Sequence, residues 1–196
     1  MNFFKKIFKL SIEPADQKSA KKQEVHLSLD DSFVHYFKEK GGKFLYCTNE
    51  QEIVSNLENI IKENKWNEMV CIDKTLSKFI KKIDVNLKKD INYSAPFLTT
   101  CEHLIADNGD ILFSSNQLKS KKIASLSEHF IVYATTSQFV KNTGEGLTGI
   151  KTNFKGNIPT NISAIKNYKI QKNDDNFLNY GNSNSKNLYL LLFENL

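Results

Sequence analysis

The chain has 196 residues, 40% of them hydrophobic and 25% charged, and a formal net charge of +5 at pH 7. This composition is typical of a globular protein with a substantial core and excludes an intrinsically disordered chain. All 27 basic residues are lysines, and they are scattered without interleaved aromatic residues. We therefore expect no nucleic-acid partner.

Cysteine spacing restricts which cofactors the chain could bind, and hydropathy restricts the compartment in which we expect it. Cys47, Cys71 and Cys101 form no C-x-x-C pair, so we expect no metal site and no cofactor held by this chain alone. Lysines interrupt the apolar residues of the first ten positions, which excludes a signal peptide. The apolar run at 188–193 is too short for a transmembrane segment. The sequence predicts a cytoplasmic protein.

We predict two regions. Residues 1–28 read as a basic amphipathic tail followed by a polar linker, and residues 29–196 as a single α/β domain. Tail contact with the domain, with a second copy or with a membrane surface remains open at this point.

The domain begins with alternating helices and strands. Apolar spacing predicts a helix at 29–37, ended by the glycines at 41 and 42, and a second helix at 53–61. Short strands are predicted at 44–47 and 69–72, and a shorter helical piece follows near 73–80. This alternation favours a parallel sheet, which binds ligands at the carboxyl ends of its strands.

The stretch at 96–116 contains a predicted hairpin. Two apolar runs, 104–106 and 111–113, flank a turn that contains Asn108 and Gly109, residues that adopt positive φ at low cost. Further strands are predicted at 130–134 and 187–193. The glycine-rich segment 143–149 is predicted as a loop, either a connection or an anion cradle that uses the amides of Gly144 and Gly146.

Carboxylates near the hairpin are the candidate catalytic groups. Glu102 and Asp107 are each placed to act as a nucleophile or general base, although Asp107 also suits ordinary turn chemistry. Cys101 and His103 offer two metal ligands, whereas a catalytic metal site needs three from the protein.

Three segments in order resemble a known family. They are EHLIADNGDIL at 102–112, LSEHFIV at 126–132 and GNIPTNIS at 156–163. They are similar to motifs of the lactate-utilisation-domain (LUD) family, the LutC-like proteins. Asn108 departs from the threonine usual in that family, and the third segment lacks the family's basic residue and its aspartate.

The resemblance implies a fold and further site residues. The implied fold is a three-layer Rossmann-like sheet of the NagB/RpiA/CoA transferase-like class. His129 matches a family position, where it is either a structural residue or an acid/base. Pro159, Thr160 and Asn161 are candidates for ligand binding, together with Asn108 and Gly109.

Two functions follow as hypotheses. In the first, the protein is an accessory component of lactate or 2-hydroxy-acid oxidation that works beside iron–sulfur or flavin oxidoreductase subunits. In the second, it is a stand-alone enzyme or binding protein for a phosphosugar or an acyl-CoA ester, an idea that rests on fold analogy. The ligand and the formation of a homo-oligomer are left open by the sequence.

Overall fold

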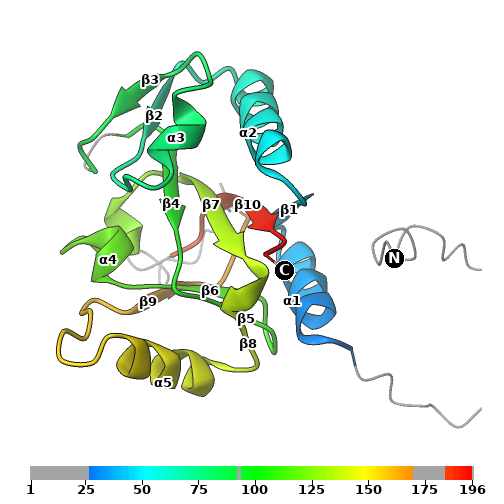
Figure 1. Cartoon of the computed structure of the whole chain (residues 1–196), viewed down its shortest axis with the longest axis vertical. Coiled ribbons are helices and arrows are strands. Elements are labelled where there is room, and N and C mark those ends of the chain that lie inside the picture. Colours follow the sequence, from blue (N-terminus) through cyan, green and yellow to red (C-terminus); the bar gives the residue numbers. More distant parts are fainter. Residues whose placement is uncertain (1–26, 92–93, 170–183, 196) are drawn as a thin grey trace, which may run out of the picture.

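The computed structural model describes residues 27–91, 94–169 and 184–195 (Figure 1). The predicted tail lies outside these residues except for its last two positions. The helices are α1 Leu29–Glu39, α2 Glu50–Asn64, α3 Ser77–Ile80, α4 Ser115–Leu118 and α5 Thr143–Asn153. The strands are β1 Lys43–Cys47, β2 Glu68–Val70, β3 Asn86–Lys88, β4 Phe97–Thr100, β5 His103–Ile105, β6 Asp110–Phe113, β7 His129–Thr135, β8 Phe139–Val140, β9 Ser163–Ile165 and β10 Asn187–Phe193.

The strands form two sheets. Sheet A has six parallel strands in the order β1-β10-β7-β4-β2-β3. Sheet B has four strands in the order β8-β5-β6-β9, with β5 and β6 paired antiparallel as the predicted hairpin. The α/β class with a Rossmann-like three-layer arrangement is therefore confirmed.

Helices cover both faces of sheet A. On one face, α2 and α3 bury apolar side chains that include Leu57 and Phe79 against strand residues such as Ile131. On the other face, α1 and sheet B enclose the largest core, and α5 covers the outer side of sheet B (Figure 1).

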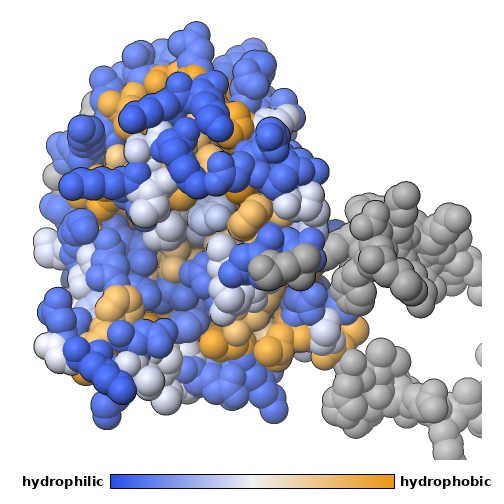
Figure 2. Space-filling view, viewed as in Figure 1, coloured by the Kyte–Doolittle hydropathy of each residue, from blue (hydrophilic) through white to orange (hydrophobic). Residues whose placement is uncertain are grey.

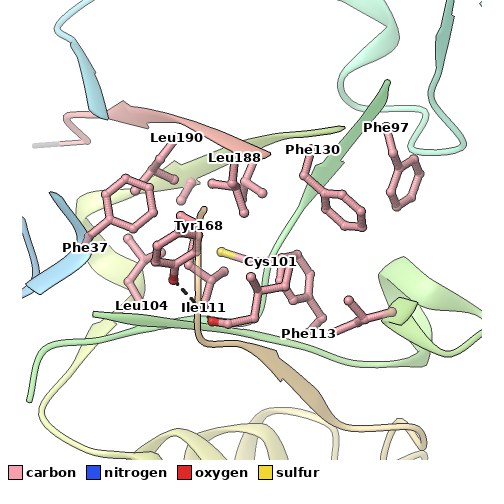
Figure 3. Close-up of a cluster of buried hydrophobic side chains, with 14 of the residues drawn as sticks. Phe37, Phe97, Cys101, Leu104, Ile111, Phe113, Phe130, Tyr168, Leu188 and Leu190 are labelled. Atoms are coloured by element: carbon pink, nitrogen blue, oxygen red, sulfur yellow. Dashed lines mark hydrogen bonds between the residues drawn. The ribbon is translucent and has the colours of Figure 1, made fainter. Parts of the chain in front are cut away.

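The core between the two sheets contains most of the buried aromatic rings. Phe37 from α1 packs against Tyr168 with ring centroids 4.4 Å apart, and Phe130 from β7 contacts Phe97 from β4 (Figure 3). The Tyr168 hydroxyl donates to the carbonyl of Gly109, 2.6 Å away, so this buried polar group is satisfied. The core thereby holds the hairpin turn against α1.

Helix ends follow local sequence signals. Ser28 caps α1, and Asn49 caps α2 by accepting from the backbone N–H of Glu52. Asp30 and Asp31 lie inside the first turn of α1, where their charges suit the helix dipole.

Exposed apolar residues are few on the viewed face. Figure 2 shows a mainly hydrophilic surface with smaller hydrophobic areas, one over α2 and α3 and one near α1. Leu27, Leu29 and Tyr36 are the exposed large apolar residues at α1. No helix among the described residues is long and apolar enough to cross a membrane.

Candidate functional site

The carboxyl ends of β2, β4 and β7 carry a group of polar side chains. Asp73 follows β2, Thr100 ends β4, Glu102 lies two residues later, and Gln138 follows β7. Because these strands are adjacent and parallel, the residues lie together at the carboxyl ends of the strands, where such sheets bind ligands. We call this side the carboxyl edge of sheet A, and the side at which the strands begin its amino edge.

Glu102 is the centre of this group. Its Oε1 accepts hydrogen bonds from Ser114 Oγ at 2.6 Å, Asn116 Nδ2 at 2.9 Å and Gln117 Nε2 at 3.1 Å. No hydrogen bond from the described residues reaches Oε2. Charge-assisted bonds of this kind fix the orientation of a half-buried carboxylate, and they leave its second oxygen for another group.

The three donors come from the start of α4. Ser114 is the N-cap, and its backbone N–H donates to Gln117 Oε1 at 2.9 Å, which completes a capping box. The cap fixes the first turn of the helix, so the donors are held in place before any ligand arrives.

Gln138 ties β7 to β4 beneath this site. Its Nε2 donates to the carbonyls of Cys101 at 2.6 Å and Glu102 at 3.2 Å, and its Oε1 accepts from the Thr135 N–H. The backbone that carries the Glu102 carboxylate is thus fixed from the neighbouring strand.

Asp73 occupies the same edge beside the end of β4. Its Oδ2 accepts from Thr100 Oγ1 at 3.1 Å, and its Oδ1 accepts from the N–H and hydroxyl of Thr75. Asp73 therefore closes its own turn and leaves Glu102 as the carboxylate with an uncommitted oxygen.

The segment with Pro159, Thr160 and Asn161 also reaches α4. Thr160 and Ser115 exchange two bonds, from Ser115 N to the Thr160 carbonyl at 2.7 Å and from Thr160 N to Ser115 Oγ at 3.0 Å. Asn161, at φ 53°, donates its side chain to the Lys121 carbonyl. The structure thus brings these three candidates next to the Glu102 site.

Asp107, Asn108 and Gly109 lie at the opposite end of β5 from Glu102, and the three residues of that strand alone span roughly 10 Å. Asp107 is exposed, and Asn108 Oδ1 accepts from the Asp110 N–H within the turn. Gly109 has φ +71°, and a Cβ there would lie 2.5 Å from the Phe37 backbone nitrogen. The turn packs tightly on α1.

The prediction of a loop at 143–149 is wrong. This segment forms the first half of α5, because Asn142 accepts from the Glu145 N–H and caps the helix. Gly146 N donates to the Asn142 carbonyl inside the helix, and its Cα side faces Leu112 and Ile105. Because Gly146 has no side chain, α5 packs closely on sheet B, and this packing is the role of the glycine here. Gly144 lies in the first turn.

His129 lies at the amino end of β7, at the other edge of sheet A. The seven residues of that strand separate its start from its end by roughly 20 Å. Burial lowers the pKa of the His129 imidazole, and the nearby charges of Lys43 and Lys186 act in the same direction. The structure does not bring Glu102, Asp107 and His129 together.

The three cysteines are buried and form no disulfide; Cys47 ends β1, whereas Cys71 and Cys101 follow β2 and β4. Burial raises the pKa of the Cys47 and Cys101 thiols and that of Cys71 to about 11, so all three stay protonated at neutral pH. Among the described residues, no three histidine, cysteine or acidic side chains are grouped to hold a metal ion.

Sequence reasoning missed the partners of Glu102. Ser114 and Gln117 do carry a local signal, the S-x-x-Q spacing of a capping box after an apolar run. Their pairing with Glu102 depends on how the hairpin returns the chain to the end of β4, which no local pattern shows.

Comparisons with known proteins agree with this architecture. The family model of the LUD domain matches residues 31–193. A crystal structure of a DUF162 family protein from Deinococcus radiodurans is similar, with a TM-score of 0.58 and 12% sequence identity over 86% of this chain and 99% of that chain. At this identity the likeness shows the fold. No curated protein matches the sequence.

Proposed function

The chain belongs to the LUD domain family, and from this premise we propose that it is an accessory component of lactate or related 2-hydroxy-acid oxidation in the cytoplasm. Its ligand would bind at the carboxyl edge of sheet A, against Glu102. The observation that carries this assignment is the Glu102 carboxylate, held at Oε1 by three donors with Oε2 left open.

Ligand contacts are assigned by distance from that carboxylate. Asn116 donates to Glu102 directly. Thr160 is hydrogen-bonded to Ser115, the residue before Asn116 in the chain. Hydroxyl and amide groups of this kind suit a small polar ligand, with Glu102 accepting from its hydroxyl group. Asp107, Asn108 and Gly109 form a separate turn and are left outside the proposed site.

Electron transfer is assigned to partner subunits. The three thiols are buried and protonated, which suits packing and not metal ligation. In the proposed assembly, iron–sulfur or flavin oxidoreductase subunits carry the redox centres. The exposed Leu27, Leu29 and Tyr36 at α1 offer apolar surface for such a contact.

The experiment combines growth and affinity purification in the cells that make this protein. Loss of the chain is expected to stop growth on lactate, wild type to restore it, and Glu102→Gln to fail. Glu63→Gln, at an exposed position of α2, removes the same charge and should restore growth. The tagged wild type should copurify iron–sulfur or flavin subunits in stoichiometric amounts. Normal growth without the chain, or recovery of the chain alone, would contradict the proposal.

The same carboxylate favours one second candidate, an enzyme that acts on acyl-CoA esters. An oriented carboxylate with an open oxygen is able to attack a thioester carbonyl, expel the coenzyme A thiolate and form an acyl anhydride at Glu102. Mass spectrometry of the chain after incubation with acetyl-CoA tests this candidate. An acetyl adduct present in wild type and absent in Glu102→Gln would support it, and an unmodified wild type would exclude it for that ester.

A further inference from the structure

The amino end of sheet A carries a second group of polar and aromatic side chains, well away from Glu102. We call it the amino-edge cluster. Its members are Lys43, Asn64, Trp66, His129, Asn187 and Tyr189.

Strand register places four of these residues on one face. Lys43 of β1 is paired with Tyr189 of β10, and Asn187 of β10 is paired with His129 of β7. Asn187 and Tyr189 are two residues apart on one strand, so their side chains share a face.

The end of α2 brings the remaining two residues over this face. The helix stops at Lys65, which adopts a left-handed conformation with φ 56°. Asn64 then donates to the Tyr189 hydroxyl, and the Trp66 ring lies 5.2 Å from the His129 ring and 6.3 Å from the Tyr189 ring. Trp66 forms an apolar wall beside the polar groups.

Tyr189 has a hydrogen that its neighbours do not use. Its hydroxyl oxygen accepts from Lys43 Nζ at 2.8 Å and from Asn64 Nδ2 at 2.9 Å. Both lone pairs are therefore occupied, and the hydroxyl hydrogen must point to a third group. The residue is only 4% exposed, and no acceptor for this hydrogen is found in the described part of the chain.

His129 presents a second unused donor. Asn187 Nδ2 lies 3.0 Å from His129 Nδ1 and donates to it, so the ring proton of the neutral imidazole is on Nε2. None of the residues in the described ranges accepts from Nε2. Lys43, which is exposed, contributes further N–H donors.

Charge in this region favours an anion. Lys43 and Lys186 both act on His129 as positive neighbours, and Glu128 is the acidic neighbour that acts against them. Lys186 is 3% exposed and donates to the Leu126 carbonyl, so its charge is not paired with a carboxylate there. An anion at the cluster would be attracted by two lysines.

We propose that the amino-edge cluster is a binding site for a small oxyanion, a carboxylate or a phosphate, which accepts from the Tyr189 hydroxyl, His129 Nε2 and Lys43 Nζ beside the Trp66 ring. This site is independent of the function proposed for Glu102, because it uses other residues at the opposite edge of the sheet.

Trp66 makes the proposal directly measurable, because it is the single tryptophan of the chain. The full chain is titrated with sodium phosphate and, separately, with sodium acetate, and sodium chloride at equal ionic strength is the reference. Trp66 emission should change in a saturable way, with half-saturation in the range of about 1–10 mM. Saturation by both anions, by acetate alone or by phosphate alone supports an oxyanion site. Saturation by only one of them also shows whether the site prefers a carboxylate or a phosphate. No saturable change beyond chloride overturns the proposal.

Two pairs of variants locate the binding. Tyr189→Phe removes the hydroxyl donor, and Lys43→Met removes the ammonium; each should raise the half-saturating concentration at least about fivefold. The controls are Tyr36→Phe on α1 and Lys151→Met on α5, both exposed, which should bind as wild type. A saturable change unaltered in Tyr189→Phe and Lys43→Met would also overturn the proposal.

Discussion

The two edges of sheet A differ in how their hydrogen-bonding groups are balanced. At the carboxyl edge, Glu102 supplies an anion that the start of α4 surrounds with three donors. At the amino edge, Tyr189 and His129 hold donors for which the described residues supply no acceptor. One edge carries its own negative charge, and the other is arranged to receive one.

This difference indicates what each edge recognises. A ligand at Glu102 must offer a donor or an electrophilic carbon to Oε2, whereas a ligand at the amino-edge cluster must bring its own oxygen atoms. Buried polar groups that lack partners cost stability, so each edge should respond differently when a group is removed.

Removal of the Glu102 carboxylate should have the largest effect. Glu102→Ala leaves Ser114, Asn116 and Gln117 without their common acceptor, and we expect the free energy of unfolding to fall by about 2–4 kcal/mol. Urea denaturation measures this loss. Glu102→Gln retains an acceptor oxygen and should lose less. Equal stability of wild type and Glu102→Ala would show that the donors are satisfied by water.

Removal of the Tyr189 hydroxyl should have a smaller effect. Tyr189→Phe keeps the ring and deletes an oxygen that accepts from Lys43 and Asn64, so we expect a loss of about 1 kcal/mol in urea denaturation. Lys43 is exposed and regains water, which limits the cost. Tyr36→Phe, at the exposed face of α1, is the matched control with no expected loss.

The smallest expected effect is a pH dependence caused by His129. The pKa of His129 is lowered in the folded chain. As the pH drops through the ordinary histidine value, the unfolded chain therefore binds more protons than the folded chain, and the free energy of unfolding decreases. The Tm difference between about pH 7.5 and about pH 5.5 should shrink by about 1–2 °C in His129→Gln. His35→Gln, at an exposed position, should leave it unchanged. A larger Tm difference in His129→Gln would reverse the assigned sign.

The elements that carry a clear sequence pattern within their own residues were predicted from the sequence. The apolar spacing at 29–37 and 53–61 and the Asn108-Gly109 turn correspond to α1, α2 and the β5–β6 hairpin. The segment 143–149 was predicted wrongly as a loop, because glycine disfavours a helix when its surroundings are ignored. In the structure, the Asn142 cap and the packing of Gly146 on sheet B stabilise α5.

Other features required the tertiary arrangement. The strand β4 was not predicted, because its four residues show no alternation when both faces are buried. Glu102 was a candidate because of its place before an apolar run, but its donors from α4 were not predicted. Glu102, Asp107 and His129 were named as separate candidates, and in the structure His129 begins a strand whereas Glu102 follows one, which puts these two at opposite edges of sheet A.

The position of β10 has a consequence for how the chain is made. β1 pairs with β10, and β10 in turn pairs with β7, so the strand at 187–193 lies between two strands synthesised much earlier. While the ribosome is still translating that segment, β1 has no neighbour in sheet A, and its apolar residues remain open to other contacts. Pairing across so long a stretch of chain forms slowly, so β1 stays without its partner strand until β10 inserts.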